Sequence, residues 1–250
     1  MIDLCEEVNV EHNNPVEIGA STVLPAHRTP VTLHTADGCE LAGELAVPLD
    51  RPPVATLVLL HPLPTAGGSM DSHLYRKMSN RLPALAGLAI LRFNTRGTSS
   101  ESGTSTGTFD AGGNEKYDVA AALEFARSRF LPRIWIVGWS FGTDLALLYG
   151  NQPGVEGLIL LSPPLLRADD ETLKSWRPSV KTIKVLVPQF DDYLRPAAAR
   201  HRFNLVPQAE LVAVPKAGHL WTGEKFVDRV LNEIVATVLP GQPPLPTAYP

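Results

Sequence analysis

Cysteine is scarce in this chain of 250 residues, where only Cys5 and Cys39 occur. Two cysteines so far apart make neither a metal-ligand cluster nor a disulfide framework, and we expect both to be free thiols. No apolar run approaches the length of a membrane span. The first residues are acidic and lack the apolar segment of a signal peptide, so a cytoplasmic location is the default expectation.

Neither sign of charge dominates, because the chain has 22 Lys and Arg residues and 26 Asp and Glu residues, for a net charge of -4. No basic stripe is present, which argues against a nucleic-acid partner. The glycines of 67–68 and 97–113 lack the Rossmann and Walker patterns, and no metal-ligand spacing occurs. We therefore expect no cofactor and no metal. The oligomeric state stays open.

The composition is ordinary for one globular domain, with 44% hydrophobic and 19% charged residues. Residues 1–30 show no sustained periodicity and are predicted to form an N-terminal arm. Residues 31–239 carry the regular patterns and are predicted to form the domain. The segment 240–250 holds five prolines and is predicted to be an extended tail.

Strand and helix patterns alternate through the predicted domain. An alternating pattern, a turn at Asp37-Gly38 and a second alternating pattern predict an opening antiparallel hairpin over 31–47. Apolar strands then follow at 54–60, 88–93, 134–137, 157–161, 183–187 and 210–214. Helical patterns separate them. This order predicts an α/β fold with a doubly wound, mostly parallel sheet, whose chemistry collects at the carboxyl ends of the strands.

The sequence Gly138-Trp-Ser-Phe-Gly142 lies between the strand 134–137 and a helical pattern at 144–149. This is the G-x-S-x-G pattern in its meaningful context of strand, tight turn and helix. The turn is expected to hold the hydroxyl of Ser140 above the sheet at a helix N-terminus. We therefore predict that Ser140 is a nucleophile.

A serine hydroxyl needs a base, and the base needs an acid that fixes its tautomer. His219 follows the last predicted strand and is the best candidate for the base. Asp191 and Asp192 both follow the strand 183–187, and the residues do not separate them cleanly. We prefer Asp192 as the acid because it stands four residues before Pro196, with Asp191 as the alternative.

Two backbone N–H groups are needed to stabilise the negative charge that forms on the substrate oxygen. Phe141, directly after the nucleophile, is predicted to supply one of them. Leu63 is predicted to supply the other, because Pro62 and Pro64 have no N–H. His61 is interpreted as a structural hydrogen-bonding residue.

These features resemble the α/β-hydrolase family over residues 31–239. The resemblance rests on His61-Pro62 after the third strand, the sequence 138–142, Asp192 and Gly218-His219, and the order Ser, Asp, His is the order of that family. Within the family the chain is similar to small, lidless, dienelactone-hydrolase-like members and to bacterial serine esterases.

Two positions depart from the family pattern. Pro62 stands where a glycine usually follows the histidine, and Gln189 replaces the glycine that is common before the acid. Neither change removes a catalytic group. A serine nucleophile in place of cysteine also speaks against dienelactone hydrolysis itself.

Three further expectations concern access to the site. The connection 163–181 has room for one short helix and no large cap. The segment 97–113 is predicted to be a mobile loop that overhangs the site and determines specificity. Trp139 and Trp221 flank the nucleophile and the base and are possible pocket residues, although burial in the core is at least as probable from the sequence.

The resemblance and the residues together predict a serine hydrolase that cleaves a carboxylic ester or thioester of a small acyl group. A peptidase or an acyltransferase would use the same triad. A non-catalytic binding protein on the same fold is the third alternative, since function resides in the site and not in the fold.

Overall fold

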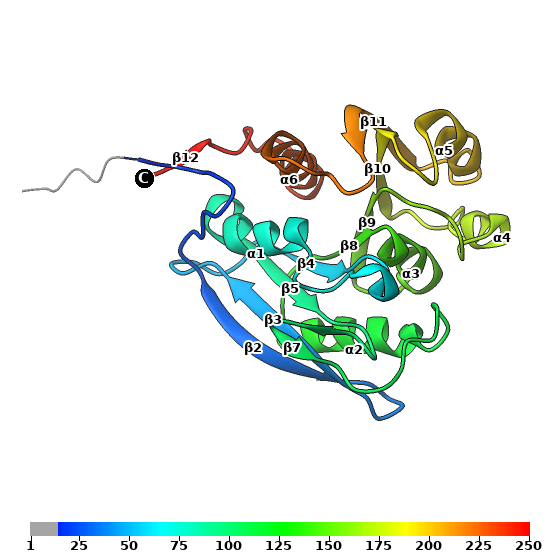
Figure 1. The fold of residues 1–250 in the computed structure, drawn as a ribbon, viewed down its shortest axis with the longest axis horizontal. Helices are drawn as coiled ribbons and strands as arrows, with labels where there is room; N and C mark the ends of the chain where they lie inside the picture. Colours follow the sequence, from blue (N-terminus) through cyan, green and yellow to red (C-terminus); the bar gives the residue numbers. More distant parts are fainter. Residues whose placement is uncertain (1–14) are drawn as a thin grey trace, which may run out of the picture.

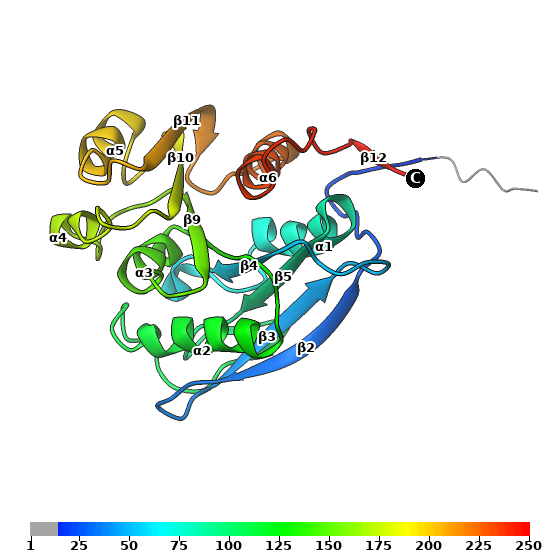
Figure 2. The same ribbon diagram turned by 180° about the vertical axis from the view of Figure 1, so that it is seen from behind.

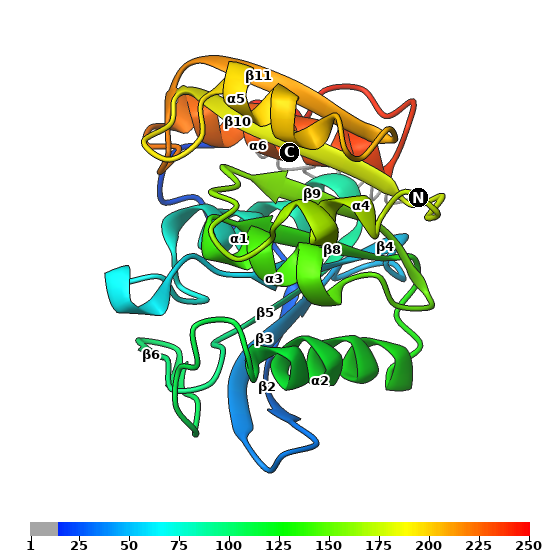
Figure 3. The ribbon, with the colours of Figure 1, turned by 90° about the vertical axis from the view of Figure 1, so that its right-hand side faces the viewer.

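The computed structural model describes residues 15–250, so the first part of the predicted arm, with Cys5, lies outside the described residues. An eight-stranded sheet in the order β11-β10-β9-β8-β4-β5-β3-β2 forms its centre. Figure 3 shows β11 at one end of the sheet and β2 at the other. The predicted α/β class is confirmed.

The sheet begins as the predicted hairpin. Strands β2 (His27–His34) and β3 (Glu40–Val47) pair antiparallel, and β3 pairs antiparallel with β5 (Leu88–Phe93). Strand β2 therefore starts inside the segment that was predicted to be arm. The tail pairs as well, since β12 (Ala248–Tyr249) lies antiparallel to β1 (Val16–Glu17).

The remaining strands of the sheet are parallel. They are β4 (Ala55–Leu60), β8 (Ile134–Trp139), β9 (Val155–Leu161), β10 (Thr182–Phe190) and β11 (Ala209–Gly218). Strands β4 and β8 are buried along their whole length, as their continuous apolar sequences require when helices cover both faces.

Helices cover the two faces of this sheet (Figures 1 and 2). Helices α1 (His73–Ala86) and α6 (Glu224–Val238) pack on one face. The other face carries α2 (Glu115–Ser128), α3 (Phe141–Tyr149), α4 (Asp170–Lys174) and α5 (Pro196–Phe203). Alternate residues of β8 enter the two apolar cores, with Ile136 in one and Val137 in the other.

The segment 97–113 differs from the predicted mobile loop. It contains a small hairpin of β6 (Ser99–Ser100) and β7 (Gly103–Thr104). The N–H of Thr106 donates to the Glu40 carbonyl at 2.9 Å, and the N–H of Ser102 donates to the Asp71 carboxylate at 2.8 Å. These bonds tie the segment to the rest of the domain.

No helix among residues 15–250 combines the length and apolar character needed to cross a bilayer.

A buried ion network joins three distant segments at the end of β5. The Arg96 guanidinium donates to Asp118 on α2 at 2.7 and 2.9 Å and to Asp37 in the hairpin turn at 2.7 Å. The Asp118 side chain is fully buried, whereas Asp37 is partly exposed. Removal of the arginine would therefore leave an uncompensated buried carboxylate, which is costly.

We expect Arg96→Met to lower the free energy of unfolding by about 3–5 kcal/mol, since it breaks a buried pair from one side. Urea unfolding measures this loss. Lys174→Met is the matched control, because it removes the same charge from an exposed pair with Glu171; its cost is expected to stay below about 1 kcal/mol. Equal losses in the two variants would contradict the role of the network.

Candidate active site

Three polar side chains lie on residues that directly follow a strand. Ser140 follows β8, Asp191 follows β10 and His219 follows β11. Because these strands are parallel members of one sheet, their carboxyl ends meet at the same edge. The Ser140 Oγ lies 2.9 Å from Nε2 of His219, and Nδ1 of His219 lies 2.9 Å from Oδ2 of Asp191.

The preference for Asp192 as the acid is wrong in this geometry. Strand β10 extends beyond the predicted end at Val187 to Phe190, so Asp191 is the residue that turns in toward His219. Asp191 is buried, and its Oδ1 accepts the N–H groups of Tyr193 and Leu194 at 2.9 and 3.0 Å. Asp192 is exposed.

The environment keeps the Asp191 carboxylate ionised. Burial alone would raise the pKa of this group, but the hydrogen bonds from His219 and from the backbone of Leu194 and Tyr193 outweigh burial, and the pKa is lowered. Because the ionised Asp191 carboxylate can only accept a hydrogen bond from Nδ1, a neutral His219 imidazole must carry its proton on Nδ1. Nε2 is then the acceptor that faces Ser140.

The turn that carries Ser140 is strained and needs glycine on both sides. Ser140 has φ 53° and ψ -120°, a conformation that non-glycine residues rarely adopt. A Cβ at Gly142 would lie 1.8 Å from the Leu60 carbonyl oxygen, and one at Gly138 would lie 2.4 Å from the Gly142 oxygen. Glycine therefore allows α3 to begin directly against the end of β4.

The two residues predicted to supply backbone donors lie close to this turn. Phe141 is the first residue of α3, where N–H groups have no partner within the helix. Leu63 has φ -55° between two prolines, and its carbonyl accepts from Ala66 and Gly68 at 3.0 and 2.9 Å. Both residues line the cavity in front of Ser140.

His61 holds the Leu63 segment and does not face Ser140. Its Nε2 accepts the N–H of Thr95 at 3.0 Å, so the proton lies on Nδ1, which donates to the Pro62 carbonyl at 2.7 Å. The Pro62 carbonyl and the Leu63 N–H belong to one planar peptide group. This hydrogen bond therefore fixes the direction of the Leu63 donor. Complete burial lowers the pKa of His61 to about 4.

The structure does not bring Trp139 and Trp221 into the cavity, and of the two alternatives left open by the sequence it shows burial in the core. Both side chains are buried in the core that lies under α1 and α6. The Trp139 Nε1 donates to the carbonyl of His219 at 3.1 Å, and Ser162 Oγ donates to the same oxygen at 3.0 Å. Trp139 thus supports the backbone of His219 from the core side, because side chains alternate between the faces of β8.

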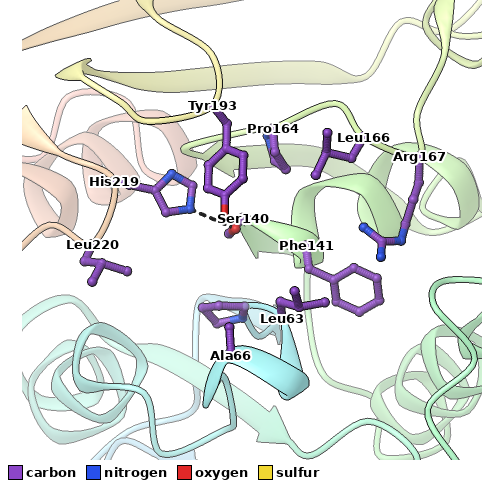
Figure 4. A pocket seen from close by; sticks show the side chains of 11 residues that line it. Leu63, Ala66, Ser140, Phe141, Pro164, Leu166, Arg167, Tyr193, His219 and Leu220 are labelled. Atoms are coloured by element: carbon purple, nitrogen blue, oxygen red, sulfur yellow. Dashed lines mark hydrogen bonds between the residues drawn. The ribbon is translucent and has the colours of Figure 1, made fainter.

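The cavity in front of Ser140, called the Ser140 pocket below, has a volume of about 120 Å³. This is small beside the roughly 300–1,000 Å³ of sites for drug-sized ligands. Figure 4 shows His219 and Leu220 on one side of it and Phe141 and Arg167 on the other. No residue of 97–113 is among those that line it, but Phe109 and Ala111 contact Phe141 and Arg167 in its wall. The role of this segment in specificity stays a prediction.

Six lining residues were not singled out from the sequence: Ala66, Pro164, Leu166, Arg167, Tyr193 and Leu220. A signal for two of them exists. Leu220 directly follows His219, and Tyr193 stands two residues after Asp191, so the strand ends that locate the triad also locate them. The Tyr193 ring lies 4.8 Å from the His219 ring. Ala66 lies in the segment after β4, and Pro164, Leu166 and Arg167 lie in the segment after β9.

Among residues 15–250 no group of three or more His, Cys, Asp or Glu side chains is arranged to hold a metal ion.

Comparison with known proteins identifies the family of this chain. A family model described as the alpha/beta hydrolase fold matches residues 55–229. Since the match covers more than half of the chain, the protein belongs to the α/β-hydrolase family. Membership supports a general hydrolase activity. No curated protein sequence matches the chain significantly.

Solved structures of similar size align with nearly the whole domain. An α/β serine hydrolase without a lid from Xanthomonas campestris is 27% identical, with a TM-score of 0.69 over 88% of this chain and 99% of that chain. A serine hydrolase homologue from Coxiella burnetii is 22% identical, with a TM-score of 0.70 over 84% and 97% of the two chains. An esterase from Pyrococcus furiosus is 17% identical, with a TM-score of 0.67 over 89% and 97%.

The likeness to small lidless hydrolases fits the connection between β9 and β10, where α4 (Asp170–Lys174) is the only helix. The predicted absence of a large cap is confirmed.

The burial of neutral His61 generates a prediction about pH. The folded protein holds this side chain unprotonated down to about pH 4, whereas the unfolded chain takes up the proton near its ordinary pKa of 6.5. Between about pH 4 and pH 6.5 the unfolded state thus binds more protons than the folded state. The free energy of unfolding is therefore highest above pH 6.5 and falls as the pH is lowered through this range, by up to about 3 kcal/mol from His61.

Imidazole ¹⁵N NMR measures the state of His61 directly, and urea unfolding between these pH values measures the stability. We expect the His61 resonances to keep the Nδ1–H pattern from pH 8 to about pH 5, and His61→Asn to show a flatter stability profile. Titration of His61 near its ordinary value would contradict the assignment.

Proposed function

We propose that this protein is a serine hydrolase that cleaves a carboxylic ester or thioester of a small acyl group through an acyl-enzyme on Ser140. The observation that carries the proposal is the continuous hydrogen-bond chain from Ser140 through His219 to Asp191 beside the Ser140 pocket. The lidless serine hydrolase from Xanthomonas campestris and the esterase from Pyrococcus furiosus support it.

In the first half of the proposed reaction His219 Nε2 takes the proton of Ser140 as the oxygen attacks the carbonyl carbon. Asp191 stabilises the imidazolium that forms, since its carboxylate already bonds to Nδ1. Negative charge develops on the carbonyl oxygen. The N–H groups of Leu63 and Phe141 are the donors positioned to stabilise that charge.

In the second half the imidazolium gives its proton to the leaving alcohol or thiol, and Ser140 keeps the acyl group. Water then enters, loses a proton to His219 and attacks the acyl-enzyme, which releases the acid and restores Ser140. The small volume of the pocket favours a short acyl chain.

The proposal is tested with a fluorophosphonate probe and with p-nitrophenyl acetate. We expect the probe to label the wild-type protein at Ser140, and Ser140→Ala to lose both labelling and at least about a thousandfold of ester hydrolysis. A wild-type protein that neither reacts with the probe nor hydrolyses short esters would instead be a non-catalytic member of the family.

The assignment of the acid is tested by a matched pair of neighbours. Asp191→Asn keeps the size of the side chain but loses the charge that fixes the tautomer of His219, and we expect kcat to fall by about 10³–10⁴. Asp192→Asn changes an exposed carboxylate and is expected to stay within about twofold, since surface substitutions away from a site have small effects. The reverse pattern would restore Asp192 as the acid.

The Leu63 donor can be removed with little change in the backbone. Leu63→Pro deletes the N–H at a residue whose φ of -55° already suits proline, and we expect kcat to fall by about 10²–10³. Leu63→Ala is the control, because it shortens the side chain and keeps the donor. Similar kcat values for the two variants, measured at saturating ester, would exclude Leu63 from the oxyanion hole.

A further inference from the structure

Arg167 supplies the only permanent positive charge among the residues that line the Ser140 pocket. It lies in the connection between β9 and α4. The other lining side chains, His219 aside, are apolar or uncharged. A guanidinium in the wall of a small, mainly apolar pocket is a specific feature, because a cation that faces an apolar space needs a partner of opposite charge.

The fold holds this guanidinium in place without using its outer nitrogens. The backbone N–H of Arg167 donates to Asp144 at 3.2 Å, and its Nε donates to the Ala111 carbonyl at 2.5 Å. The guanidinium carbon lies 4.8 Å from the centre of the Phe141 ring. Neither Nη1 nor Nη2 makes a hydrogen bond to any of residues 15–250. The planar pair of donors that matches a carboxylate is therefore free.

The nearest acid, Asp144, forms an ion pair with Arg167 but makes no hydrogen bond to these outer nitrogens. Asp144 lies 4.0 Å from Nη1, beyond hydrogen-bond distance, and is fully buried outside the lining of the pocket. Its carboxylate accepts the backbone N–H groups of Arg167 and Ala168. Burial raises the pKa of Asp144, although these N–H groups and the Arg167 charge oppose the shift. The pocket side of the guanidinium remains open to an anion.

The side of the pocket determines which part of a substrate meets Arg167. The leaving alcohol must lie near His219, which gives it a proton, and the carbonyl oxygen must point to the Leu63 and Phe141 donors. Figure 4 shows Arg167 across the pocket from His219. The acyl part of the substrate is the part that extends to that side.

We infer that the preferred substrates are esters whose acyl part ends in a carboxylate, that is, monoesters of short dicarboxylic acids, with the carboxylate bound by Nη1 and Nη2 of Arg167. This inference rests on the proposed function. The reaction is the same acyl transfer: the ester C–O bond breaks, the Ser140 Oγ–C bond forms, the serine proton leaves with the alcohol, and water then releases the dicarboxylate. No further reactant is needed.

The test compares two esters with acyl chains of equal length, monomethyl succinate and methyl butyrate, by acid release in a pH-stat. We expect the wild-type protein to have the higher kcat/KM for the anionic ester. Arg167→Met should lower the ratio of kcat/KM for the anionic over the neutral ester by about tenfold or more, mainly through KM, because it removes a charge-assisted pair. Arg167→Lys should recover part of this ratio.

Arg129→Met is the matched control. Arg129 is also stacked on a ring, that of Phe125, but it lies exposed at the end of α2 and lines no part of the pocket. Its loss changes the net charge equally and is expected to leave the ratio unchanged. An Arg167→Met protein with a lower melting temperature and the wild-type ratio would overturn the inference, since Arg167 would then only secure its loop.

The wild-type protein decides the matter if Arg167→Met does not fold. A preference for methyl butyrate over monomethyl succinate would overturn the inference. Hydrolysis of the neutral ester in that case would leave the proposed function intact. Failure to hydrolyse either ester, together with failure of the fluorophosphonate probe to label Ser140, would reject the proposed function itself.

Discussion

The close approach of α3 to the end of β4 is the constraint on which the site depends. A Cβ at Gly142 would overlap the carbonyl of Leu60, so only glycine lets the helix begin at that distance. Phe141, the first residue of α3, and Leu63 then line the same cavity. This close approach therefore brings together Ser140, Phe141 and Leu63 from segments far apart in the chain.

A second layer of buried polar groups holds this arrangement. His61 is neutral and fixes the peptide group before Leu63, while Trp139 and Ser162 bind the carbonyl of His219. None of these side chains needs to touch a substrate. They orient groups that do, which is how a protein can hold a strained residue such as Ser140 in one conformation. Stability and reactivity are therefore linked at this edge of the sheet.

The sequence predicts the features that depend on local pattern. Periodicity and glycine placement predict the turn at 138–142, the order of strands and helices and the short connection 163–181. They also predict the pair Ser140 and His219. To identify the aspartate that faces His219, one must know where β10 ends. The strand does not end at the predicted Val187 but continues to Phe190. A shift of a few residues at a strand end decides which of two adjacent aspartates turns inward.

Features that depend on tertiary contacts escape such reasoning. The glycine, serine and threonine content of 97–113 is typical of a mobile loop, yet Glu40 and Asp71 supply distant partners for its backbone. Trp139 and Trp221 stand close to Ser140 and His219 in sequence but are buried in the core. For Trp139 the reason is that successive side chains of a strand face opposite ways. Arg167 has no motif, and its position follows only from the turn after β9.

The short connection between β9 and β10 also bears on the timing of the reaction. With α4 as its only helix, the connection contains no domain-sized element that must swing aside before a substrate enters or a product leaves. Conformational gating limits turnover in many enzymes with mobile lids. In the proposed reaction, a rim of this kind would leave the rate to bond making and bond breaking, and to diffusion through the mouth of the cavity.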